Sequence, residues 1–140
     1  IEPAMFERVF AAHVLGVVNV VSALSPNLRA GNRVVFVDSL ARLLPFPRSQ
    51  AYGASKAALH NLTLSFAQKY APNVKVNSIA PALLMFNEGD DDTYKQKALK
   101  KSLLETIPGA QEAVKAMLYL LNSEYVTGQT LHLNGGRHLK

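Results

Sequence analysis

The chain has 140 residues, of which 49% are hydrophobic and 18% charged, and its 15 Lys and Arg against 10 Asp and Glu give a formal net charge of +5. This composition excludes disordered and collagen-like chains, which need few apolar residues or far more than 8 Gly and 7 Pro. The sequence has no Cys, so it lacks a disulfide framework and a thiolate metal site, and we expect a cytoplasmic protein with one core.

Residues 2–24 predict a helix that is apolar on nearly every side. Hydrophobic residues recur at steps of three and four, as from Phe6 to Phe10, and valines fill the remaining faces. We expect such a helix to be buried on more than one side. The longest apolar stretch, residues 14–21, is shorter than the roughly 20 residues that span a bilayer, so we expect no membrane segment.

The rest of the chain alternates between strand and helix patterns. Their order is typical of a parallel sheet built from βαβ crossovers. We therefore expect an α/β fold, a Rossmann-like doubly wound parallel sheet of which only the C-terminal half is present, as three strands with flanking helices. The predicted strands cover residues 33–37, 74–79 and 130–133, and the predicted helices cover residues 51–70, 93–104 and 110–121.

Tyr52 and Lys56 lie four residues apart at the start of the helix predicted over residues 51–70, so their side chains share one face. A free phenol has a pKa near 10, too high for easy proton exchange at neutral pH, but an adjacent cation favours the phenolate. The pair then suits general acid or base chemistry. A solvated i,i+4 pair is the alternative, because a chain of this composition contains about 0.3 such matches by chance.

Ser39 follows the strand predicted over residues 33–37 and stands thirteen residues before Tyr52. A strand end and a helix start can meet at the carboxyl edge of a parallel sheet, where open α/β proteins bind their ligands. We therefore expect Ser39 near Tyr52 and Lys56.

Four motifs in this order, VVFVDS, YGASKAAL, VKVNSIAP and VTGQTLHLNGG, resemble the second half of a short-chain dehydrogenase/reductase. The resemblance implies that residues 1–140 are the C-terminal part of one such domain, without its N-terminal half that binds the cofactor phosphates. It also implies an NADPH-dependent oxidoreductase. In that family, the position of Ser39 polarises the substrate carbonyl or imine, that of Tyr52 transfers the proton, and that of Lys56 holds the nicotinamide ribose and eases the tyrosine proton off.

The stretches APALLMFNE and LNGGRHLK are similar to the pteridine reductases of this family. This implies a reduced pterin, such as dihydromonapterin, as the small-molecule substrate, which is reduced to its tetrahydro form. The resemblance places cofactor contacts at Pro81, Leu83 and Leu84, with Tyr52 and Lys56. A carbonyl or alcohol oxidoreductase remains an alternative, as does a non-catalytic fragment or assembly subunit.

The sequence departs from the family pattern at several positions. Ala82 stands where the family usually has glycine, and pteridine reductases often have Asp at the place of Ser39, whereas Asp38 lies one residue earlier and should point to the other side of the strand. His13 stands where the family usually has asparagine. It is either a buried, hydrogen-bonded histidine or a catalytic relay beside Lys56.

The remaining charged and apolar stretches predict structure rather than further chemistry. Residues 88–92 lack the alternating ligand spacing of a calcium site and fit a helix cap, so we expect no metal. The lysines between residues 95 and 101 fit a solvated face better than a nucleic-acid surface. We expect a homo-oligomer through helices 1–24 and 51–70, which would otherwise leave large apolar patches exposed.

Overall fold

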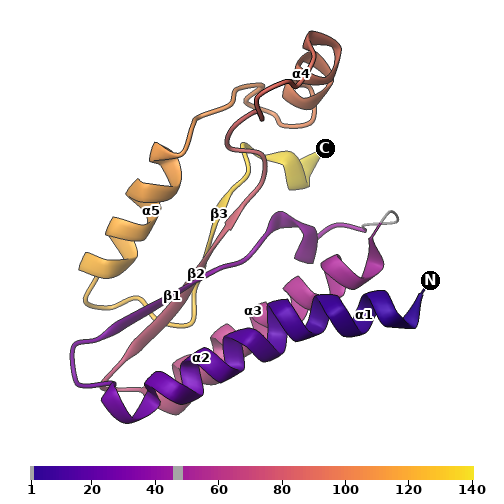
Figure 1. The fold of residues 1–140 in the computed structure, drawn as a ribbon. Helices are drawn as coiled ribbons and strands as arrows, with labels where there is room; N and C mark the ends of the chain where they lie inside the picture. The colour runs from indigo at the N-terminus through magenta and orange to yellow at the C-terminus, as the bar shows by residue number, and fades with distance from the viewer. Residues whose placement is uncertain (1, 46–48) are drawn as a thin grey trace.

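The computed structural model describes residues 2–45 and 49–140 (Figure 1). The first helical segment is continuous, with a π-helical turn η1 between two α-helices, and the short elements η2, η3 and η4 are 3₁₀-helices. In chain order, the elements are α1 (Pro3–Phe10), η1 (Ala11–Leu15), α2 (Gly16–Leu24), η2 (Ser25–Asn27), β1 (Arg33–Val37), η3 (Leu40–Arg42), α3 (Gln50–Tyr70), β2 (Lys75–Pro81), α4 (Asp92–Leu99), α5 (Gln111–Asn122), β3 (Thr130–Leu133) and η4 (Arg137–Leu139).

The three strands form a parallel sheet in the order β1-β2-β3, in which Val35 pairs with Asn77 and Ile79 pairs with Leu131. The helices α1, α2 and α3 lie on one face of the sheet, and α5 covers the other (Figure 1). The predicted α/β fold and its three parallel strands are therefore confirmed. Within the described residues, β1 pairs only with β2, so the outer edge of β1 lacks a neighbouring strand.

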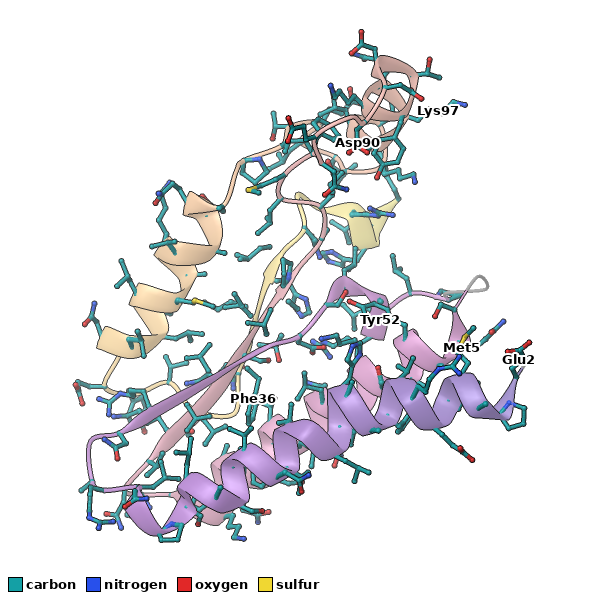
Figure 2. All side chains as sticks on the ribbon, in the orientation of Figure 1. Glu2, Met5, Phe36, Tyr52, Asp90 and Lys97 are labelled. Carbon is teal, nitrogen blue, oxygen red and sulfur yellow. The ribbon has the colours of Figure 1, made fainter. Side chains whose placement is uncertain are left out.

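Two apolar clusters hold the helices against the sheet. On one face, Val76 of β2 packs with Leu59 of α3 and with Phe36 of β1, which Figure 2 shows between the sheet and the long helices. On the other face, Ile79 packs with Leu120 of α5. Val76 and Ile79 face opposite ways because side chains alternate along a strand. The same alternation places Asp38 on the α3 side of β1.

The N-terminal helix is much less buried than its apolar sequence predicts. From residue 2 to residue 24, Val21 is the one residue classed as buried, and Leu15 is 57% exposed. The prediction that this helix is buried on more than one side is therefore wrong. The helix contacts α3 along one face, and within the described residues its other apolar faces are uncovered.

One helix in the described part of the chain, Pro3–Asn27, is long and apolar enough to cross a membrane by length and composition alone. The sequence prediction considered only the apolar stretch 14–21, and so missed that the whole helix passes this test. Core helices of globular proteins pass the same test, and this helix lies along α3.

The acidic stretch before α4 caps that helix, as predicted. The Asp91 carboxylate accepts a hydrogen bond from the Tyr94 N–H at 2.7 Å. The helix is shorter than predicted, because it ends at Leu99 and a turn follows. In this turn the Lys101 N–H donates to Ala98 O. Lys101 therefore belongs to a loop beside the carboxyl ends of the strands and not to a helical face.

Candidate active site

A cavity of about 320 Å³ opens at the carboxyl ends of β1 and β2. Ser39 and Tyr52 both line it, so the sequence prediction that the end of one strand meets the start of a helix is correct. Figure 2 shows Tyr52 at this end of α3, beside the chain that leaves β1. Other residues that line the cavity are Pro81, Leu83, Tyr94, Ala98, Lys101 and Arg137.

Lys56 lies beside Tyr52 on the same face of α3. Its Nζ stands 5.7 Å from the centroid of the Tyr52 ring and donates a hydrogen bond to Val37 O at 3.1 Å. Burial lowers the pKa of Lys56 below its ordinary value, and the Asp38 carboxylate opposes this change. The ammonium is thus held at the end of β1, between a tyrosine ring and a buried carboxylate.

Ser39 keeps a hydroxyl proton available toward the cavity. Its Oγ accepts a hydrogen bond from the Ala41 N–H at 3.2 Å, which caps the short helix η3. A hydroxyl has one hydrogen to donate and two lone pairs that accept, so accepting from Ala41 leaves the hydrogen free to bind a ligand atom. Ser39 can therefore donate to a carbonyl oxygen or an imine nitrogen in the cavity.

Asp38 directly precedes Ser39 but is not among the residues that line the cavity. Its side chain is fully buried, and its Oδ2 lies 3.1 Å from Arg42 Nε, an ion pair whose atoms are not aligned for a hydrogen bond. Burial raises the pKa of Asp38, and the Ser39 N–H, Arg42 and Lys56 oppose that rise, in decreasing order. Asp38 is thus the buried anion that faces the Lys56 ammonium.

Arg42 extends this charged network across the sheet to β3. Its Nη2 lies 2.9 Å from His132 Nε2. A guanidinium only donates, so His132 Nε2 must accept, and the imidazole is neutral with its proton on Nδ1. Burial, and then the Arg42 charge, lower the pKa of His132, which agrees with this tautomer. Sequence reasoning missed Arg42 and His132, because no motif joins residues 90 positions apart.

His13 lies beside Tyr52, from the π-helical turn η1. The two rings meet edge to face with their centroids 5.4 Å apart, and His13 Nδ1 is 3.1 Å from Ser55 Oγ. The Ser55 hydroxyl donates its single hydrogen to Tyr52 O at 2.8 Å, so His13 Nδ1 must be the donor to Ser55 Oγ. This leaves the Nε2 of His13 as an acceptor. Burial, and then the charge of Lys56, lower the pKa of His13 and favour the neutral ring.

The geometry of His13 agrees in part with both predicted roles, a buried, hydrogen-bonded histidine and a catalytic relay beside Lys56. The side chain is half-buried and hydrogen-bonded, as a structural histidine would be, and it also stands next to the tyrosine and within the electrostatic reach of Lys56. The π-helical turn carries the chain past Tyr52 at this point. Such turns often occur at functional sites.

The residues present fit one end of a nicotinamide cofactor. The Lys56 ammonium and the Tyr52 hydroxyl suit ribose hydroxyl groups, and Pro81 and Leu83 line the cavity beside them. The carbonyl of Leu84 accepts from the Gly109 N–H at 2.9 Å, which fixes the loop after β2. In the sequence, no glycine-rich turn leads from a strand into a helix, so these residues offer no such cradle for the cofactor phosphates.

The described residues contain no group of three or more His, Cys, Asp or Glu side chains placed to hold a metal ion. The polar side chains that line the cavity are the hydroxyls of Ser39, Tyr52 and Tyr94, the ammonium of Lys101 and the guanidinium of Arg137.

Comparison with known proteins adds a family relationship to this geometry. A family model described as enoyl-(acyl carrier protein) reductase, one of the short-chain dehydrogenase/reductase models, matches residues 1–138. A solved short-chain dehydrogenase/reductase from Burkholderia xenovorans is 31% identical, with a TM-score of 0.86, and the match covers 100% of this chain and 57% of that one.

Two further relatives are similar in sequence or in fold. The dihydromonapterin reductase of Escherichia coli strain 536 is 61% identical over 90 residues, which make up 64% of this chain and 38% of that protein. The FolM alternative dihydrofolate reductase 1 of Brucella suis, solved in complex with NADP, has a TM-score of 0.86 at 29% identity, and the match covers 100% of this chain and 57% of that one. The chain thus spans little more than half the length of these solved relatives.

Proposed function

The chain belongs to the short-chain dehydrogenase/reductase family, and from this premise we propose that it carries the proton-transfer and ribose-binding site of an NADPH-dependent reductase of reduced pterins. The observation that carries the proposal is the shared cavity of Ser39 and Tyr52, with Lys56 beside the tyrosine ring. The 61% identity to a dihydromonapterin reductase supports the choice of a dihydropterin substrate.

In the proposed reaction, a C=N double bond of the substrate becomes a C–H and an N–H bond. NADPH, held at its ribose by Tyr52 and Lys56, would supply the hydride for the imine carbon. Tyr52 gives its phenolic proton to the imine nitrogen, which accepts it with the electron pair of the broken π bond. Ser39 donates its free hydroxyl hydrogen to the substrate and orients the ring. The product is the tetrahydropterin.

Lys56 serves two steps of this proposal. Its ammonium holds the ribose of the cofactor by hydrogen bonds, and its charge stabilises the phenolate that remains after proton transfer. Asp38 keeps a negative charge beside the ammonium, which favours the charged form of Lys56 in a partly desolvated place. We assign His13 a relay role, because its Nε2 can accept a proton next to Tyr52 and Lys56.

NADPH is the proposed cofactor because the Brucella relatives were solved with NADP. Pro81, Leu83 and Leu84 are its proposed contacts at the nicotinamide end, beside Tyr52 and Lys56. The prediction that residues 1–140 form the C-terminal part of a single domain is kept as part of this proposal. It agrees with a match that covers the whole chain and 57% of a solved relative.

A second candidate is the reduction of a carbonyl or the oxidation of an alcohol. The observation that favours it is the free hydroxyl hydrogen of Ser39, which suits a carbonyl oxygen at least as well as an imine nitrogen. A third possibility, a non-catalytic assembly subunit, predicts that NADPH does not bind at all.

The test is to follow the oxidation of NADPH with a dihydropterin and, separately, with simple ketones and aldehydes. It uses the complete protein of which residues 1–140 would be the C-terminal part, because these residues alone offer no glycine-rich cradle for the cofactor phosphates. We expect turnover with the dihydropterin, and its loss in the Tyr52→Phe variant. Turnover with carbonyl compounds alone would favour the second candidate. Absence of measurable NADPH binding by that complete protein would contradict both reductase proposals and favour the assembly subunit. Weak binding by residues 1–140 alone would instead agree with their lack of a cradle for the cofactor phosphates.

A further inference from the structure

We propose that the cavity beside Tyr52 contains a subsite for an anionic group of the substrate, formed by Lys101 and Arg137. This inference rests on the proposed function and deepens it, because it names the class of reduced pterin that the site accepts. The expected ligand is a dihydropterin whose side chain carries a carboxylate or a phosphate.

The two cations reach the cavity from different segments. Lys101 lies in the turn after α4, and Arg137 begins η4, directly beyond the end of β3. Both line the cavity of about 320 Å³ that Ser39 and Tyr52 also line. This volume lies in the range of small-molecule sites, about 300–1,000 Å³. One ligand can therefore contact the reacting groups and both cations.

The backbone holds these two segments together. The Leu103 N–H donates to Gly135 O at 2.8 Å, and the Lys140 ammonium donates to Lys100 O at 2.6 Å. These bonds join the turn after α4 to the segment that follows β3, on either side of Lys101 and Arg137. The backbone positions that carry the two cations are therefore fixed relative to each other by the fold, which reduces the cost of ordering these segments on binding.

Acidic side chains in these segments are already engaged elsewhere. Glu105 pairs with Lys100 at 3.1 Å and with Lys140 at 3.7 Å, and Glu112 pairs with Lys115 at 3.3 Å. Among the ion pairs of the described residues, Lys101 and Arg137 have no acidic partner. The cavity thus presents two positive charges without a counter-charge from the described chain.

Such a pair favours an anionic ligand for two reasons. Two cations in a partly enclosed cavity attract a negative charge more strongly than they would in open water. The guanidinium of Arg137 can also form two parallel hydrogen bonds to one carboxylate or phosphate, while Lys101 adds a compact charge. A neutral dihydropterin would leave both groups unused.

The experiment compares substrates that share the pterin ring and differ in charge: dihydrofolate with its carboxylates, a dihydropterin phosphate, and uncharged dihydromonapterin. The variants are Lys101→Gln, Arg137→Gln and the double variant. Lys97→Gln is the matched control, because Lys97 lies on α4 outside the cavity lining and Figure 2 shows it pointing away from Tyr52.

We expect the double variant to raise KM for the preferred anionic substrate by about tenfold or more, with kcat changed by less than about twofold. KM for dihydromonapterin should stay unchanged, and Lys97→Gln should behave like the unmodified protein. The Arg137→Lys variant should raise KM for the anionic substrate less than Arg137→Gln does, because lysine keeps the positive charge. A larger effect with dihydrofolate identifies a carboxylate ligand, and a larger effect with the pterin phosphate identifies a phosphate.

Two results would overturn the subsite. One is an equal change in KM for charged and uncharged substrates, which would indicate a structural role, and the other is no change at all. Absence of turnover with every pterin would instead contradict the proposed function. The subsite is then tested by equilibrium binding of folate and of pterin to the unmodified protein and to the double variant. Weaker binding of folate by the double variant, with unchanged binding of pterin, supports the subsite. Unchanged binding of folate refutes it.

Discussion

The N-terminal helix and α3 lie side by side, and their burial is the reverse of their hydropathy. The N-terminal helix is rich in valine and leucine, yet Val21 is the one buried residue between residues 2 and 24. The α3 helix is far more polar, yet it has a buried residue in every turn over most of its length. These residues are Ala51, Ser55, Leu59, Thr63 and Ala67.

The difference teaches that neighbours, and not the hydropathy of a helix, decide its burial. The sheet covers one side of α3 and the N-terminal helix covers another. Two of the buried residues of α3 are polar, but their hydroxyls form hydrogen bonds within the helix. Ser55 Oγ donates to Tyr52 O at 2.8 Å, and Thr63 Oγ1 donates to Leu59 O at 3.0 Å. Burial of these groups therefore leaves no unpaired donor.

The largest effect is expected at the start of α3, where Tyr52 lines the cavity. In the Tyr52→Phe variant of the complete enzyme, turnover should fall by a factor of about 10² or more while cofactor binding stays near normal, because only the transferred proton is lost. Steady-state kinetics and NADPH titration measure the two quantities. A variant that retains more than about a third of the rate would refute the proton-transfer role.

The next effect compares the two helices directly by the same substitution. Leu59→Ala in α3 should lower the free energy of unfolding by about 2–5 kcal/mol, because it opens a cavity in the core. Leu15→Ala in η1 should cost about 0.5 kcal/mol or less, because Leu15 is 57% exposed. Urea unfolding of both variants measures this. Equal losses would indicate that a further surface covers η1 in solution.

The third prediction is that the exposed apolar residues of the N-terminal helix are covered in solution. We expect a second copy of the chain to cover the exposed apolar residues of helices 1–24 and 51–70, since large apolar patches are rare on monomers. Sedimentation at micromolar concentration should give more than the monomer mass. Leu15→Glu should shift the distribution toward monomer, and Glu7→Gln on α1 is a control without an added charge. A monomer at this concentration would contradict the prediction.

The smallest effect concerns the charges that face Lys56. Asp38 at the end of β1 and His13 of η1 are the titratable groups that influence this region, and Asp38 raises the pKa of Lys56. In Asp38→Asn that support is lost, so the ammonium form should be lost at lower pH. The alkaline limb of the pH–rate profile should therefore move to lower pH, while Asp92→Asn at the surface should leave it in place.

An unchanged alkaline limb in a folded Asp38→Asn variant would assign Asp38 a purely structural role. Circular dichroism checks the fold before the profile is measured. A shift to higher pH would also contradict the prediction, because removing an anion cannot stabilise the charged form of Lys56.

The sequence by itself determined the elements that carry local signals. Short runs of β-branched and aromatic residues predict the strand at 33–37, and alternation predicts the strand at 74–79. The proximity of Tyr52 to Lys56 follows from their spacing on one helix. The approach of Ser39 also followed from a general rule, since the carboxyl ends of parallel strands bind ligands at one edge. Arg137 follows β3 at that same edge, so the rule was a signal for it that sequence analysis did not use.

Only the tertiary structure decided which long-range partners meet. The contact of Arg42 with His132, the hydrogen bond of His13 to Ser55 and the entry of Lys101 into the cavity join segments with no shared pattern. Sequence analysis assigns Lys101 to the solvated face of a helix, because the spacing of charges along the chain contains no information about which segments lie next to it. Hydropathy likewise reports what a helix can bury, and the position of its neighbours decides what it does bury.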